Sequence, residues 1–211
     1  MRVSFAVFPA TAHLHPVTPL AWALQSAGHE VRIVSPPEMA DSISAVGLTP
    51  VPLGETVDLT AAAPDIGPRL DQVTRALSLT ADTHLWEILR RRVLPALAKY
   101  FPAGPAAPGH RDMLDDIVEF ARGWRPDLVL WDPAFPPAPV AARVSGAAPV
   151  EDPQVAVVRP MLERYGLEFD EETLLGQWTV DPMPARLRLP LGVRSVPVRW
   201  VPFNGSAAVP D

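Results

Sequence analysis

Two histidines and one aspartate stand where this sequence could support acid–base chemistry. His13 and His15 follow the first apolar segment, Arg2–Phe8, and Asp132 directly follows another, Leu128–Trp131. A neutral imidazole accepts a proton from a hydroxyl group near physiological pH, and a helix N-terminus disfavours its protonated form. An aspartate bonded to the other ring nitrogen fixes the tautomer and stabilises the imidazolium that forms. The pattern therefore predicts a base made of His13 and Asp132.

Other kinds of site fit these residues less well. His13 and His15 could share a metal ion, but no third ligand follows at a suitable spacing. A phosphate-binding turn needs glycines, and residues 8–19 contain none. The Gly-x-Ser-x-Gly motif of α/β hydrolases is absent. Histidines in turns and Asp-Pro steps after strands also occur without any catalytic role, so a purely structural role for His13 and Asp132 stays open.

The first strand and the helix after it must position the histidines. Arg2–Phe8 is a short apolar run rich in valine and phenylalanine, which is typical of a buried strand. Pro16 and Pro19 suit the first turn of a helix that Gly28 ends, so the histidines are expected in the turn before it. In an open α/β sheet such turns lie at the carboxyl edge, where these folds hold their ligands.

The next segments repeat this alternation of strand and helix. Glu30–Ser35 is predicted as a strand, Glu38–Val46 as a short helix and Thr49–Leu53 as a third strand. Strands so closely spaced pair in parallel through right-handed crossovers, which predicts an α/β fold: a Rossmann-like open parallel sheet with helices on both faces. In such sheets the first strand and the first strand of the return half, Leu128–Trp131, are neighbours, which brings the aspartate to the histidines.

The rest of the chain alternates long connections with helices. Residues 55–81 are mostly small, polar or proline, which predicts a functional or mobile loop. Apolar side chains at helical spacing predict a helix from Asp82 to near Pro102, whose aromatic side chains could line a hydrophobic pocket or belong to the core. Helices are further predicted over 111–124, 140–144 and 154–165, and strands over 177–180 and 195–203.

The composition of the chain limits the classes of protein to which it can belong. With 211 residues, 48% of them hydrophobic and 20% charged, the chain is expected to form one globular domain. No apolar run is long enough to cross a membrane, and no cleavable signal is recognised. The lack of cysteine excludes disulfides and thiolate metal sites and fits a cytoplasmic protein. A formal net charge of −6 with scattered arginines argues against nucleic-acid binding.

Several stretches resemble one enzyme family. The sequence AHLHPVTPLAWALQSAGHEV at 12–31 closely resembles the opening of bacterial antibiotic glycosyltransferases, GT-B enzymes that attach deoxysugars to macrolides and other polyketides. WRPDLVLWDP at 124–133 is similar to the same family. ERYG at 163–166, GQWTVDPMP at 176–184 and VPFNG at 201–205 resemble most the branch that transfers amino-deoxysugars such as desosamine, mycaminose or forosamine.

The resemblance implies a reaction and its residues. His13 takes the position of the family's general base and Asp132 that of the acid that orients it. The implied reaction is an inverting transfer, in which an aglycone hydroxyl attacks the anomeric carbon of a TDP-linked deoxysugar without a metal or other cofactor. Relatives in the aminosugar branch often work with a cytochrome P450-like auxiliary protein, whose contacts would fall in 59–79 and 85–100. The residues expected to line the acceptor pocket are Leu14, His15, Leu85, Trp86, Pro133 and Phe135.

The sequence departs from the family pattern in two places, and both limit which part of the enzyme it resembles. The family binds its nucleotide sugar with a second Rossmann-like domain, and no match to that domain's motif occurs here. Residues 1–203 are therefore predicted to be the acceptor-binding half and 204–211 the start of a linker to a C-terminal donor domain, so the half alone is expected to be inactive. The family also has a longer stretch where this chain passes from Ala148 to Asp152. The alternative function is a non-catalytic module of the same fold that binds an apolar ligand or a protein.

Overall fold

A parallel sheet lies at the centre of the molecule. The computed structural model describes residues 1–57, 100–102, 104–145, 155–169, 178–183 and 194–205. The strands run in the order β3-β2-β1-β4, with β1 paired to both β2 and β4. This confirms the predicted open parallel sheet and the neighbouring places of its first strand and Leu128–Trp131. The strands are β1 (Arg2–Ala6), β2 (Glu30–Ser35), β3 (Thr49–Pro52) and β4 (Leu128–Trp131).

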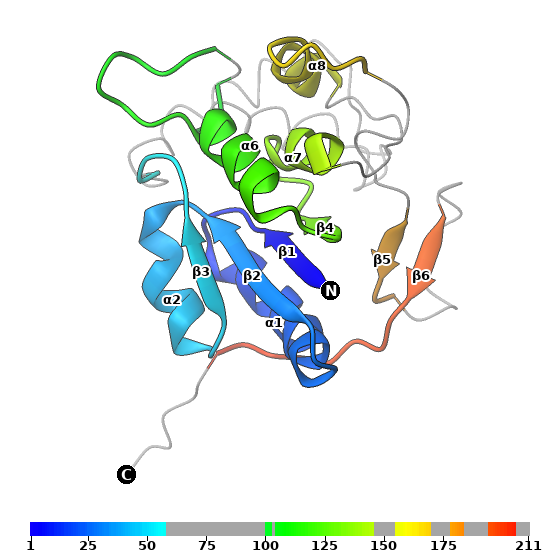
Figure 1. Cartoon of the computed structure of the whole chain (residues 1–211). Coiled ribbons are helices and arrows are strands. Elements are labelled where there is room, and N and C mark those ends of the chain that lie inside the picture. Colours follow the sequence, from blue (N-terminus) through cyan, green and yellow to red (C-terminus); the bar gives the residue numbers. More distant parts are fainter. Residues whose placement is uncertain (58–99, 103, 146–154, 170–177, 184–193, 206–211) are drawn as a thin grey trace, which may run out of the picture.

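Helices cover both faces of this sheet, as predicted (Figure 1). One face packs against α1 (Thr11–Ser26), the short 3-10 helix η1 (Pro37–Met39) and α2 (Ala40–Ala45). The other face packs against α6 (Met113–Trp124) and α7 (Ala138–Ser145), and α8 (Val155–Glu163) packs in turn against α7.

The first strand carries hydrophobic side chains on both of its faces. Successive side chains of a strand point to opposite faces of the sheet. Val3 and Phe5 pack in the cluster beneath α1 and α2, whereas Ala6 and Phe8 pack in the cluster beneath α6 and α7. Because both faces of this parallel sheet are covered, hydrophobic side chains occur on both of them, and only the small Ser4 is a buried polar side chain of this strand.

The amphipathic helix α6 forms where its pattern predicts it. Its buried side chains are Leu114, Ile117, Val118 and Ala121. Asp112 caps the helix by accepting hydrogen bonds from the backbone of the first turn, and the helix ends at Arg125 in the left-handed region, with φ 52°. The cap and the apolar stripe together fix how α6 lies on the sheet.

The start of α1 differs from the prediction. The helix begins at Thr11, before the predicted start at Pro16, so both histidines lie on its first two turns rather than in a preceding loop. The backbone of Ala10 is extended, and its carbonyl accepts hydrogen bonds from His13 N at 2.9 Å and Leu14 N at 3.2 Å. The helix therefore begins where the Ala10 carbonyl accepts its first hydrogen bonds. No side chain caps this position, so the sequence carries no signal that marks it.

A second, two-stranded parallel sheet consists of β5 (Thr179–Asp181) and β6 (Ser195–Pro197). The predicted strand over 195–203 is therefore too long. Proline cannot donate to a strand ladder, and β6 ends at Pro197. Residues 198–205 continue past α1 in Figure 1 without forming a further strand.

Some predictions fall outside the described residues. These are most of the 55–81 loop, the helix from Asp82 to near Pro102, and the short junction from Ala148 to Asp152. Within the described ranges, none of the helices is both long and apolar enough to cross a bilayer.

Candidate active site

His13 and Asp132 meet at the carboxyl edge of the central sheet. His13 lies on the first turn of α1, which follows β1, and Asp132 follows β4. Because β1 and β4 are neighbours, the backbone N–H of Asp132 donates to the carbonyl of Ala6 at 3.0 Å. This bond continues the strand pairing and places the aspartate beside α1. The imidazole Nδ1 then forms a hydrogen bond with Asp132 Oδ2, so the structure brings together two residues 119 positions apart.

The turn after β4 holds the aspartate in place. Asp132 Oδ1 accepts a hydrogen bond from Ala134 N at 2.8 Å, and the Asp132 carbonyl accepts one from Phe135 N at 2.9 Å. The side chain of Asp132 is 13% exposed and that of His13 is 36% exposed. One carboxylate oxygen therefore stabilises the turn, and the other binds the imidazole of His13.

The pKa of His13 is raised above its ordinary value of 6.5. The hydrogen bond to Asp132 is the largest cause, desolvation of the ring opposes it, and the charge of the carboxylate adds to the rise. The helix N-terminus alone predicts the opposite direction. A carboxylate in contact with the ring outweighs the partial charge of the helix end, so the prediction of a disfavoured imidazolium is wrong for this site.

An aromatic cluster packs beside the imidazole. The ring of Phe8 lies 5.1 Å from that of His13, between centroids, and 6.2 Å from the rings of both Tyr100 and Phe101. Phe101 in turn lies 4.7 Å from Phe135. The sequence pattern assigns Phe8 only to the buried strand. Its position at the end of that strand, just before the helix that carries His13, is the signal that could have marked it as a neighbour of that residue.

The residues predicted to line an acceptor pocket lie in different surroundings. Leu14 and Phe135 are fully buried, each in a different core cluster. Pro133 is exposed beside Asp132. The ring of His15 packs against Phe203 at 5.2 Å between centroids, in the segment after β6. Leu85 and Trp86 lie outside the described residues, and contact of any of these six residues with an acceptor stays a prediction.

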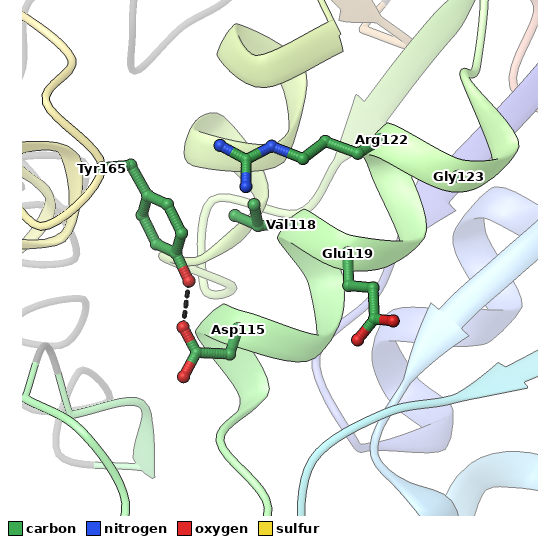
Figure 2. A pocket seen from close by; sticks show the side chains of 6 residues that line it. All are labelled: Asp115, Val118, Glu119, Arg122, Gly123 and Tyr165. Atoms are coloured by element: carbon green, nitrogen blue, oxygen red, sulfur yellow. Dashed lines mark hydrogen bonds between the residues drawn. The ribbon is translucent and has the colours of Figure 1, made fainter.

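A pocket of about 430 Å³ lies on α6, and neither His13 nor Asp132 lines it (Figure 2). Asp115, Glu119, Arg122 and Tyr165 line it together with Val118 and Gly123. The hydroxyl of Tyr165 donates to Asp115, and burial, followed by the bond to that carboxylate, raises the pKa of the phenol. Arg164 pairs with Asp112 and Asp115 at 2.7 and 2.5 Å. These contacts fasten the end of α8 to α6.

No cluster suited to a metal ion appears in the part of the chain that the structure describes: three or more histidine or acidic side chains do not converge there.

Comparison with known proteins gives the chain a family. Residues 22–211 match the family described as erythromycin biosynthesis protein CIII-like, N-terminal domain. All of the chain aligns with the 3-alpha-mycarosylerythronolide B desosaminyl transferase of Saccharopolyspora erythraea at 35% identity, covering 57% of that protein. It also aligns over its whole length with the 10-deoxymethynolide desosaminyltransferase of Streptomyces venezuelae at 36% identity, covering 56% of it.

The fold is shared with solved glycosyltransferases. The crystal structure of glycosyltransferase VinC in complex with dTDP superimposes with a TM-score of 0.74 at 31% identity, over 100% of this chain and 56% of VinC. The predicted fold class, a parallel sheet flanked by helices that corresponds to one GT-B half, is thereby confirmed. The chain spans about half the length of the relatives that it matches. It belongs to the family of N-terminal domains similar to that of erythromycin biosynthesis protein CIII.

Proposed function

We propose that this chain is the acceptor-binding half of an inverting glycosyltransferase that transfers a deoxysugar, and more narrowly an amino-deoxysugar, to a hydroxyl of a macrolide or other polyketide aglycone. The observation that carries the proposal is the His13–Asp132 pair at the ligand-binding edge of the sheet. The names of the relatives, two of them desosaminyl transferases, support the substrate class.

The chemistry follows from which ring nitrogen is engaged. Asp132 binds Nδ1, which leaves Nε2 as the nitrogen that faces the acceptor hydroxyl in this proposal. Nε2 removes the hydroxyl proton while the hydroxyl oxygen forms a bond to the anomeric carbon of a TDP-sugar, and the bond from that carbon to the nucleotide diphosphate breaks. Asp132 stabilises the imidazolium that results. The raised pKa of His13 is consistent with this role, since it reports that the protonated ring is favoured beside Asp132.

The donor and further partners are part of the same proposal. The glycine-free turn after β1 offers no cradle for a pyrophosphate, so we assign the TDP-sugar to a C-terminal donor domain joined through residues 204–211. VinC, which this chain matches over about half of VinC's length, was solved with dTDP bound. We propose no metal or other cofactor, a cytoplasmic setting that the cysteine-free sequence supports, and a P450-like auxiliary protein as an optional partner.

Replacement of the base tests the proposal. The chain would be joined to the C-terminal half of VinC, and turnover of a TDP-deoxysugar with a panel of macrolide aglycones, including 10-deoxymethynolide, would be followed by mass spectrometry. His13→Gln should lower turnover about a hundredfold or more, because a general base is lost. His110→Gln, at an exposed histidine, should leave it unchanged. Full turnover in His13→Gln would favour the alternative of a non-catalytic binding module.

A further inference from the structure

The turns of α1 that carry His13 lack several features that usually stabilise a helix. No side chain caps the helix at Ala10, and the first turn contains no acidic residue. Pro16 and Pro19 lie inside the helix and have no N–H. They cannot donate the hydrogen bonds that other residues would make to the carbonyls four positions earlier, those of Ala12 and His15. The position of His13 therefore depends on contacts made from outside the helix.

One such contact comes from the far end of the described chain. The ring of Phe203 lies 5.2 Å from that of His15 and 5.0 Å from that of Trp22, and both pairs are edge-to-face. His15 and Trp22 are seven residues apart, which puts them on one face of α1 two turns from each other. Phe203 thus bridges the part of the helix in which Pro16 and Pro19 interrupt the hydrogen bonding.

Both ends of this bridge are fixed in place. The Trp22 indole N–H donates to the carbonyl of Val46, just after α2, at 2.8 Å. Gly205 has a φ of +87°, and a Cβ there would come within 3.2 Å of His15 Cε1. The segment around Phe203 is therefore closely fitted to α1, and the glycine is needed both for its backbone conformation and for its distance from His15.

We propose that Phe203 is a positioning residue for His13. By bridging His15 and Trp22, it holds the proline-containing turns of α1 in place and so keeps the imidazole of His13 against Asp132. We call the three residues His15, Trp22 and Phe203 the helix clamp. The value of the clamp for catalysis rests on the function proposed above, whereas its effect on the geometry of His13 does not.

The test uses this chain alone and two observables of α1. Phe203→Ala should lower the pKa of His13 by about 0.5 or more, because the hydrogen bond to Asp132 loosens. NMR titration measures this pKa, and the His13→Gln variant assigns the signal of His13. Phe203→Ala should also speed hydrogen exchange of the His13 and Leu14 amides about tenfold. Trp200→Ala is the matched control: it removes a neighbouring aromatic side chain that is 48% exposed, and it should change neither observable.

Further variants keep the proposal falsifiable. Phe203→Tyr retains the aromatic ring, so the His13 pKa and the exchange of the His13 and Leu14 amides should stay at the values of the unchanged protein. If Phe203→Ala does not fold, Gly205→Ala displaces the segment more mildly and should act in the same direction. An unchanged His13 pKa and unchanged amide exchange in a folded Phe203→Ala or Gly205→Ala protein would overturn the clamp, even if the melting temperature fell. Neither observable involves sugar transfer, so an inactive chimera with an intact clamp would count against the proposed function alone.

Discussion

His13 and Asp132 are the residues on which the proposed chemistry depends. Two influences act on the pKa of His13 in opposite directions. The carboxylate of Asp132 raises it, and the N-terminus of the helix on which His13 lies would lower it. The imidazole is neutral, and able to accept a proton, only above its pKa, so a raised pKa narrows the range of pH in which His13 can act as a base. The rate of proton removal by His13 should therefore still rise with pH above 6.5, the ordinary pKa of histidine.

Replacement of Asp132 by asparagine separates the two influences. Without the carboxylate, the His13 pKa should fall, which NMR titration of this chain can measure directly. In the chimera, turnover should rise with pH as His13 loses its proton, and Asp132→Asn should move that rise to lower pH. The limiting rate at high pH should fall about tenfold or more, because the amide does not stabilise the imidazolium. A pH profile that is the same in both proteins would exclude Asp132 from the titration of the base.

At the scale of elements, the cap of α6 connects two helices and a loop. Asp112 accepts hydrogen bonds from Leu114 N at 2.8 Å and from Ala106 N at 3.1 Å, and it also accepts one from Arg164. Its side chain is only 10% exposed. One carboxylate thus begins α6, holds the preceding loop and binds the residue that follows α8, which makes it a good probe of how these elements are joined.

Loss of this cap should destabilise the fold in a measurable way. Asp112→Ala should lower the free energy of unfolding by about 1–2 kcal/mol, from the lost cap and the weakened attachment of Arg164. Urea denaturation followed by circular dichroism measures this change. Glu119→Ala, on the exposed face of the same helix, is the control and should stay within about 0.5 kcal/mol. Equal losses in the two variants would show that the cap contributes nothing beyond ordinary helix propensity.

For the whole molecule, the proposed function predicts that this chain binds the acceptor and not the nucleotide sugar. We expect the chain to bind a macrolide aglycone such as 10-deoxymethynolide and to bind TDP no more tightly than about 1 mM, because the turn between β1 and α1 has no glycine. Isothermal titration of the chain with each compound measures both affinities. His13→Gln should still bind the aglycone, since binding does not require the base. Micromolar TDP binding by this chain would contradict the division of substrates between the halves.

Features that depend on local patterns could be predicted from the order of the residues alone. Alternation of apolar and polar residues predicted the strand Glu30–Ser35, and a short continuous apolar run predicted Leu128–Trp131. A spacing of 3.6 residues predicted the buried stripe of α6. Such patterns depend only on neighbours close in the chain. The rule for strand order in doubly wound sheets was enough to place Asp132 near His13.

Features that depend on residues far apart in the chain could be seen only once the elements were packed together. The start of α1 at Thr11 depends on the backbone of Ala10, and the pKa of His13 on a carboxylate 119 positions away. The packing of Phe203 on His15 and Trp22 joins the two ends of the chain. No local pattern encodes these contacts, since they arise from how the packed elements meet and not from the propensity of any one segment.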